Sequence, residues 1–322
     1  MEAKIAYCIK LCNIFVKKQK MSILVVGTVA FDAIETKHGK TDKIVGGAAT
    51  YICHSAAPFS NNIKLVSVVG GDFPKHEILK LEKKGVDTLG LQIKSEEKTF
   101  FWSGKYHDDM NVRDTIETQL NVLENFVPNV PKSFSKSKFL MLGNLMPSVQ
   151  QKVLDQMQER PELIILDTMN FWMDNLLDDL LKSLKKVDIL TINDEEARQL
   201  SGEDTLVRAA KKITKMGPKY LIIKKGEHGS MLFGEEKIFL TPAYPLETVI
   251  DPTGAGDSFA GGLIGYLSSC KKINFQSIRT AILYATAAAS FCVQKFGTEG
   301  AEKVTISEIK KRVKYLKEIT TV

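Results

Sequence analysis

The sequence predicts an α/β fold: a three-layer sandwich with a mainly parallel central sheet, helices on both of its faces, and a small β-sheet lid. Three observations predict it. Short, continuously apolar runs such as residues 23–26 are typical of strands covered on both faces. From Phe139 onward, strand and helix patterns alternate regularly, which indicates parallel βα units. Residues 98–107 are rich in aromatic residues but too polar for a central strand, so we expect them in a ribbon that stands off the main sheet.

Length and composition limit the function classes. The 322 residues suffice for one large α/β domain or two average ones, and 44% hydrophobic with 25% charged residues is typical of a soluble globular protein. Most of the net charge of +6 lies in residues 1–20, so we expect no nucleic-acid partner. No apolar run reaches the roughly 20 residues that span a bilayer, and we expect no membrane partner. Five cysteines without a CxxC pair favour a reducing, cytoplasmic location.

Residues 1–20 are interpreted as an extension outside the domain, which then comprises residues 21–322. Residues 5–16 are semi-apolar and precede a lysine cluster, whereas a signal peptide has its charges first. The extension is either an appended helix or the product of an upstream translation start, and a helix lying on a membrane surface is the alternative.

The first strand, residues 22–27, predicts a ligand-binding edge. Asp32 follows beyond its carboxyl end, where open α/β sheets bind ligands, although a lone aspartate there is more often a turn or cap residue. Gly46 and Gly47 then open a short helix that ends at Pro58, and a double glycine permits close approach of a ligand to the backbone. A second strand is expected at 65–69.

The lid is expected to comprise residues 33–45 and about 91–115. Its aromatic side chains either pack within the ribbon or across a dimer, or they cover a substrate; they are Phe100, Phe101, Trp102 and Tyr106.

The second half of the chain supplies the βα units. The expected elements are strands at 139–142, 163–166, 187–192 and 220–223, and helices at 149–159, 174–184, 195–200 and 205–216. Two further helices are expected at 278–294 and 306–319.

Two junctions within these units carry candidate ligand-binding residues. Asn193 is expected to cap a helix and Glu196 to complete a capping box; Glu196 is also placed to bind a divalent metal through water, and the two interpretations are compatible. Lys224 leaves a strand beside a glycine turn containing Gly226 and Gly229, so it can reach a phosphate or remain solvated. His228 is interpreted as an exposed loop residue.

The stretch Asp251-Pro-Thr-Gly-Ala-Gly-Asp257 is the most informative in the chain. A strand end runs into a small-residue turn and then an amphipathic helix, so Gly254, Ala255 and Gly256 lie at a helix N-terminus. Free amides and the helix dipole bind anions there. Asp257 adds a carboxylate beside the anion cradle, where it can accept a proton from an attacking hydroxyl. The alternative is an ordinary glycine turn followed by an aspartate in the first helical turn.

Taken in this order, these motifs resemble those of the ribokinase-like (PfkB) carbohydrate and nucleoside kinases. The resemblance covers about residues 21–320 and rests on Gly46-Gly47, Asn193-xx-Glu196, Lys224-x-Gly226-xx-Gly229 and the Asp251–Asp257 stretch. It implies an ATP-dependent transfer of the γ-phosphoryl group to a hydroxyl, usually a CH2OH group. The absence of a Gx4GK[ST] P-loop and of the protein-kinase motifs disfavours other kinase folds.

The resemblance also implies roles for individual residues. Asp257 corresponds to the catalytic base and the amides of residues 254–256 to the anion hole. The nucleotide side is implied to consist of Asn193, Glu196, Lys224, Gly226, Gly229 and, at the adenine position, Thr286. The acceptor side is implied to consist of Asp32, Gly46, Gly47 and Tyr51.

The implied cofactors are ATP and Mg²⁺, the latter held through water by Glu196. A monovalent cation, K⁺, is a further candidate ligand near Asp251. Two departures from the family pattern bear on specificity: Tyr51 stands where an asparagine is common, and Thr286 stands where many members have asparagine or histidine.

The leading hypothesis is a kinase of a small sugar, and the alternative is a nucleoside kinase of the same fold. Tyr51 and the aromatic lid could stack on a base or close over a sugar. A non-catalytic ligand-binding relative is a minor alternative, and intact Asp257 speaks against it. A dinucleotide-dependent oxidoreductase lacks its GxGxxG motif after the first strand. A homodimer formed through the lid is a further expectation.

Overall fold

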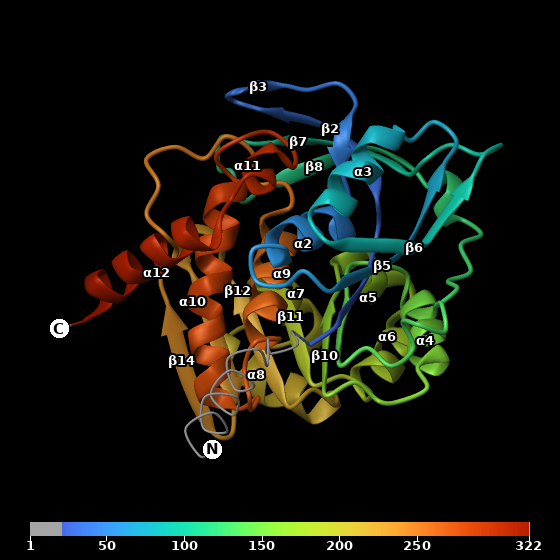
Figure 1. Cartoon of the computed structure of the whole chain (residues 1–322). Coiled ribbons are helices and arrows are strands. Elements are labelled where there is room, and N and C mark those ends of the chain that lie inside the picture. Colours follow the sequence, from blue (N-terminus) through green and yellow to red (C-terminus); the bar gives the residue numbers. More distant parts are fainter. Residues whose placement is uncertain (1–20, 322) are drawn as a thin grey trace, which may run out of the picture.

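A nine-stranded sheet forms the centre of the molecule in the computed structural model, which describes residues 21–321 (Figure 1). Its strand order is β14-β13-β12-β11-β10-β9-β1-β5-β6. Neighbours from β12 to β6 are parallel, and β13 pairs antiparallel with both β12 and β14. The predicted extension, residues 1–20, lies outside the described residues.

The strands of this sheet are short, and all except the two edge strands, β6 and β14, are mostly buried. They are β1 (Ile23–Val26), β5 (Ile63–Gly70), β6 (Val86–Lys94), β9 (Phe139–Leu142), β10 (Leu163–Asp167), β11 (Ile189–Asn193), β12 (Tyr220–Lys224), β13 (Ser230–Gly234) and β14 (Lys237–Thr241).

Helices cover both faces of the sheet. One layer comprises α2 (Ala48–Ala56), α3 (Lys75–Lys83), α9 (Ala255–Leu267) and α10 (Phe275–Cys292), with α11 (Glu299–Glu302) and α12 (Ile306–Thr320) outside it. The other comprises α4 (Pro147–Gln156), α5 (Asn170–Asn175), α6 (Leu177–Leu184), α7 (Asp194–Ser201) and α8 (Leu206–Ile213). The predicted helix 174–184 is therefore two helices, which meet at Leu176.

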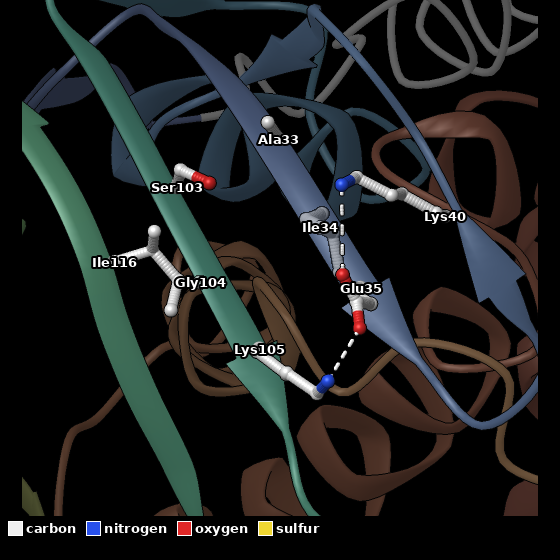
Figure 2. Close-up of a pocket in the computed structure, with 8 residues that line it drawn as sticks. All are labelled: Ala33, Ile34, Glu35, Lys40, Ser103, Gly104, Lys105 and Ile116. Atoms are coloured by element: carbon white, nitrogen blue, oxygen red, sulfur yellow. Dashed lines mark ion pairs between the residues drawn. The ribbon is translucent and has the colours of Figure 1, made fainter.

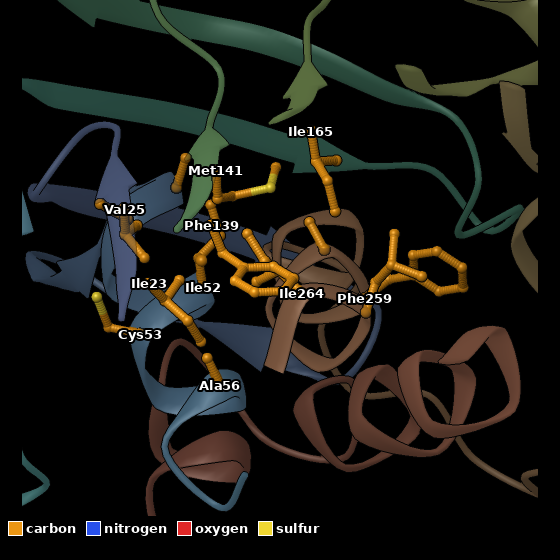
Figure 3. Packing of buried hydrophobic residues seen from close by; sticks show 14 of the residues in the cluster. Ile23, Val25, Ile52, Cys53, Ala56, Phe139, Met141, Ile165, Phe259 and Ile264 are labelled. Atoms are coloured by element: carbon orange, nitrogen blue, oxygen red, sulfur yellow. The ribbon is translucent and has the colours of Figure 1, made fainter. Parts of the chain in front are cut away.

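Each central strand serves two hydrophobic cores because its side chains alternate between the faces. Ile23 and Val25 pack with α2 and α9, whereas Leu24 and Val26 pack on the α4–α8 side. Figure 3 shows the first core, in which Ile264 of α9 lies near Phe139 of β9. The predicted three-layer α/β fold with a second small sheet is confirmed.

The second sheet is the lid sheet, and it lies at one end of the molecule above α2 and α9 (Figure 1). Its five strands are β2 (Ala30–Thr36), β3 (Gly39–Lys40), β4 (Ile44–Gly46), β7 (Phe101–Tyr106) and β8 (Arg113–Gln119). Strand β2 follows β1 almost directly, so the lid sheet begins at the carboxyl end of a central strand.

One expectation about the lid differs from the structure. Residues 91–94 were expected in the lid ribbon, but they belong to β6, which pairs in parallel with β5 at the edge of the main sheet. An edge strand contacts helices less completely, so its exposed polar positions resemble those of a free ribbon. At its other end, the lid sheet continues through β8 to Gln119, beyond the expected end at about residue 115.

Among residues 21–321, no helix is long and apolar enough to cross a membrane.

Candidate active site at the carboxyl edge of the sheet

The Asp251–Asp257 turn is organised by a buried carboxylate. Asp251 accepts hydrogen bonds from the amide of Thr253 at 2.8 Å and from the amide of Gly297 at 2.9 Å. Gly254 has φ +74°, a left-handed conformation that glycine adopts without strain, and it is the N-cap residue of α9. No side chain caps this helix, so its N-terminus is available to an anion.

Asp257 lies in the first turn of α9, deep in the site. Burial, together with the nearby carboxylate of Asp167, raises its pKa from 3.8 to about 7, although Lys224 and Arg113 act in the opposite direction. A carboxyl group with a pKa near neutrality can both hold and release a proton at physiological pH.

Lys224 carries positive charge to the same place. It ends β12, and its Nζ lies 3.1 Å from both carboxylate oxygens of Asp167, which ends β10. A Cβ added to Gly256 would lie 3.1 Å from this Nζ, so the ammonium group rests against the start of α9. Burial lowers the pKa of Lys224, but Asp167, Glu196 and Asp257 outweigh burial and keep that pKa above its usual value.

Asn193 and Glu196 form the predicted capping box. The amide of Asn193 donates to Glu196 Oε2 and the amide of Glu196 donates to Asn193 Oδ1, both at 2.7 Å. Asn193 pairs with Lys224 across β11 and β12, so the two motifs are neighbours. Burial raises the pKa of Glu196 to about 7, with Lys224 acting against it.

The predicted glycine turn connects β12 to β13 through the short 3₁₀ helix η3 (Gly226–His228). Gly226 has φ +54° and Gly229 has φ +80°, so both use backbone conformations that favour glycine. A Cβ on Gly226 would lie 2.0 Å from Asn111 Oδ1, which shows that the turn between β7 and β8 reaches this loop. His228 is exposed, as predicted. Thr286 is buried on α10, the helix that packs along α9.

The predicted acceptor-side residues lie together between β2, β4 and α2. The amide of Gly47 donates to the Asp32 carboxylate, and a Cβ on Gly46 would lie 1.8 Å from Asp32 Oδ2. Burial and the charge of Asp251 raise the pKa of Asp32 to about 7.

Tyr51 is almost fully buried beneath this group, with 1% of its surface exposed. Its ring fills the space beside Gly254, where an added Cβ would lie 2.4 Å from two ring carbons. Its hydroxyl has no hydrogen-bond partner among the described residues. Tyr51 therefore links the acceptor side to the turn that leads into α9.

The lid sheet adds further side chains to this region. Tyr106 is buried and accepts a hydrogen bond from Thr253 Oγ1 at 3.1 Å. Trp102 pairs in register with Asp32, and its Nε1 donates to Thr115 Oγ1 at 3.3 Å. Its indole lies across Gly104, where any Cβ would overlap the ring.

Two site residues, Asp167 and Arg113, were missed from the sequence, which also gave no sign of the hydrogen bond from Thr253 to Tyr106. Asp167 directly follows an apolar strand, and the rule that ligands bind at carboxyl ends of parallel strands points to it. Arg113 and Tyr106 lie on strands of the lid sheet. The pairing register of these strands decides which of their residues share a face of the sheet, and the sequence shows no signal for that register.

The site has the carboxylate oxygen donors that suit a magnesium ion. Asp167 ends β10 and Glu196 lies in the first turn of α7, directly after the neighbouring strand β11; both are buried carboxylates. Mg²⁺ in nucleotide sites is typically held by one or two carboxylates together with phosphates and water. Among residues 21–321, no three His, Cys, Asp or Glu side chains form a cluster that could hold a metal ion by themselves.

Comparisons with known proteins agree with this geometry. The family model described as pfkB family carbohydrate kinase matches residues 20–304. The cytidine kinase of Thermococcus kodakarensis is 29% identical over 274 residues, which is 81% of this chain and 96% of that protein.

Solved structures show the same fold. A putative ribokinase II from E. coli, in complex with ATP and Mg²⁺, has a TM-score of 0.75 at 23% identity and covers 92% of this chain and 99% of its own. A Burkholderia thailandensis nucleoside kinase in complex with inosine has a TM-score of 0.76 at 19% identity and covers 91% and 97%.

Proposed function

Since this chain belongs to the pfkB family of carbohydrate kinases, and is thus an ATP-dependent kinase of a sugar or a nucleoside, we propose that it phosphorylates a CH2OH group. The observation that carries this proposal is a half-buried carboxylate, Asp257, beside an uncapped helix N-terminus and the Lys224 ammonium group. The Asp257 carboxylate, which can accept a proton, thus lies close to the N-terminus of α9, which can bind an anion, and to the positive charge of Lys224.

Asp257 is the proposed base. It accepts the proton of the acceptor hydroxyl as that oxygen attacks the γ-phosphorus, and a pKa near 7 suits this task at neutral pH. The amides of Gly254, Ala255 and Gly256 are the proposed anion hole. In the structure the Ala255 amide donates to the carbonyl of Pro252 at 3.1 Å, so it joins the anion hole only by sharing or giving up this hydrogen bond.

The nucleotide side is proposed to be the edge formed by β11, β12 and the η3 turn. Lys224 neutralises phosphate charge, Asn193 orients the phosphates, and Glu196 with Asp167 holds Mg²⁺, directly or through water. When bound, the ion neutralises phosphate oxygens in phosphoryl transfer. Gly226 and Gly229 shape the loop beside the nucleotide, and Thr286 is the proposed adenine contact.

The acceptor side is proposed to be Asp32, Gly46, Gly47 and Tyr51. A buried carboxylate such as Asp32 discriminates strongly between acceptors that offer a hydroxyl pair and those that do not, because an unpaired buried carboxylate is costly. Both the free sugar expected from the sequence and the ribose of a nucleoside offer such hydroxyls.

One observation favours the nucleoside. Trp102 is half-buried, lies against Gly104 and pairs in register with Asp32, so it provides an aromatic side chain next to the acceptor carboxylate. The cytidine kinase of Thermococcus kodakarensis also matches over 96% of its own length.

The test is an assay of ADP release with ATP and a panel of pentoses, hexoses, inositol and nucleosides. We expect the highest kcat/KM with a nucleoside, and a Trp102→Ala variant should raise KM for it by about tenfold, since base stacking contributes about 1–3 kcal/mol. A free sugar as the best substrate would overturn the nucleoside assignment, and no turnover on any acceptor would favour the ligand-binding alternative.

A monovalent cation near Asp251 is a further part of the proposal. Asp251 is buried in a turn that shapes the N-terminus of α9, so a cation beside it would affect the anion hole indirectly. Replacing K⁺ by tetramethylammonium in the same assay should lower kcat, and an unchanged rate would exclude this role.

The outer face of the lid sheet is proposed as a homodimer contact. Figure 2 shows a hollow there in which Glu35 lies between Lys40 and Lys105, and Ile116, 65% exposed, lines its edge. Paired opposite charges beside an apolar residue suit a twofold contact between identical surfaces. Ile116→Asp should convert the dimer to a monomer in light scattering, and a monomeric wild-type protein would refute this contact.

A further inference from the structure

Arg113 is the residue of the lid whose position is not explained by packing. It begins β8 and is exposed, and none of the ion pairs found between residues 21 and 321 includes it. Its only described aromatic contact is loose: the guanidinium carbon lies 5.8 Å from the centre of the Trp102 ring. An unpaired arginine held beside an active site is free to bind an anion.

The register of the lid strands directs Arg113 toward the site. Arg113 pairs with Tyr106 across β7 and β8, and cross-strand partners project from the same face of a sheet. Tyr106 is buried and is bonded to Thr253 in the turn before α9. Arg113 is therefore carried on the face of the lid sheet that meets the anion cradle.

A second contact fixes the lid strand from the other side. The turn between β7 and β8 brings Asn111 against Gly226 in the nucleotide loop, so that a Cβ on this glycine would overlap its carboxamide oxygen. Arg113 is two residues away from Asn111 and thus lies between two anchors, one at the anion cradle and one at the nucleotide loop.

The electrostatics of the site agree with this placement. The positive charge of Arg113 acts to lower the pKa of Asp257 and also that of Glu196, although burial is the larger influence on both and raises them. Asp257 is on the acceptor side of the cradle and Glu196 on the nucleotide side. The guanidinium is therefore close enough to both carboxylates to affect their pKa values.

We propose that Arg113 binds the γ-phosphoryl oxygens during transfer, so that the lid completes the catalytic site when it lies on the body of the enzyme. The inference rests on the proposed function. In the step, the acceptor oxygen forms a bond to the γ-phosphorus, the bond from that phosphorus to the bridging oxygen breaks, and ADP leaves with the electron pair. The acceptor proton goes to Asp257. Arg113 stabilises the charge on the oxygens that move.

The experiment compares Arg113→Ala and Arg113→Lys with Arg208→Ala, an exposed arginine on α8 whose loss changes the net charge equally. Arg113→Ala should lower kcat by about 10²-fold or more, with KM for ATP and acceptor changed less than about threefold. Arg113→Lys should be intermediate, because a lysine keeps the charge but not the planar fork. Added guanidinium should restore part of the activity of Arg113→Ala.

A binding measurement separates catalysis from structure. The affinity for ADP alone should be unchanged in Arg113→Ala, while the affinity for ADP with aluminium fluoride and acceptor should fall by about the same factor as kcat. The pKa seen in the pH profile of kcat/KM should also rise, because a cation near Asp257 has been removed.

Three results would overturn the inference: an unchanged kcat, a rise in acceptor KM alone, or equal losses in Arg113→Ala and Arg208→Ala. These results leave the proposed function intact, since the wild-type enzyme would still turn over. A wild-type protein without activity on any acceptor would instead refute the proposed function itself.

Discussion

Asp257→Asn tests both the chemistry and the electrostatics of the site. Asparagine has nearly the same shape but cannot accept the acceptor proton, so we expect kcat to fall by about 10²- to 10⁴-fold. The substitution also removes an ionisable group whose pKa is raised from 3.8 to about 7. The same variant should therefore be less active and more stable at alkaline pH.

The sign of the stability effect follows from proton binding. Between about pH 4 and pH 7, the folded protein keeps a proton on Asp257 that the unfolded chain has released, so the free energy of unfolding falls as pH rises. The loss is complete above the folded pKa and amounts to about 4 kcal/mol, because one pKa unit corresponds to 1.36 kcal/mol. Asp257→Asn does not undergo this loss.

The assay is thermal unfolding of the ligand-free protein at pH 5 and pH 8, alongside kcat at both values. The stability advantage of Asp257→Asn over wild type should grow by about 3 kcal/mol from pH 5 to pH 8, or roughly 5 °C in Tm for a chain of this size. Asp155→Asn, an exposed carboxylate paired with Lys186, serves as the control and should show no such growth.

Two results would refute the reasoning. Parallel loss of stability in wild type and Asp257→Asn between pH 5 and pH 8 would show that Asp257 is not the group that holds the buried proton. Retention of most of kcat by Asp257→Asn would show that Asp257 is not the base.

Two further predictions concern the packing around the site. Gly254→Ala should lower the free energy of unfolding in urea by about 2–4 kcal/mol, because the residue has φ +74° and an added Cβ overlaps the Tyr51 ring. The control is Gly202→Ala, which has φ +68° but open space and should lower the free energy of unfolding by only about 1 kcal/mol. Equal losses in the two variants would contradict the packing argument. Lys224→Met should destabilise the protein by about 3–5 kcal/mol, because it leaves Asp167 buried without its partner. Adding Asp167→Leu to this variant should recover much of the lost stability. If stability does not recover, the broken ion pair is not the cause of the loss.

Much of the fold could be predicted because its signals are local. A strand buried on both faces must be apolar along its whole length, and residues 23–26 and 163–166 show this directly. The capping box at Asn193 and Glu196 was likewise predictable, since both partners lie within one helical turn. Residues 91–94 of the edge strand β6 were wrongly assigned to the lid. An edge strand has a mixed pattern of polar and apolar residues, which does not indicate which sheet the strand belongs to.

The features of the candidate site also divide into those that the local sequence predicts and those that only the tertiary structure determines. By itself, the sequence determined that a glycine turn, a helix N-terminus and Asp257 are adjacent, because they are consecutive along the chain. Only the tertiary structure decided that Lys224 reaches Asp167 from another strand, that the ring of Tyr51 lies against Gly254, and that Arg113 pairs with Tyr106 across the lid strands. These contacts join residues far apart in sequence through strand order and register, and burial by the whole fold raises the pKa of Asp257. No local pattern encodes such distances, because they depend on how all the layers pack together.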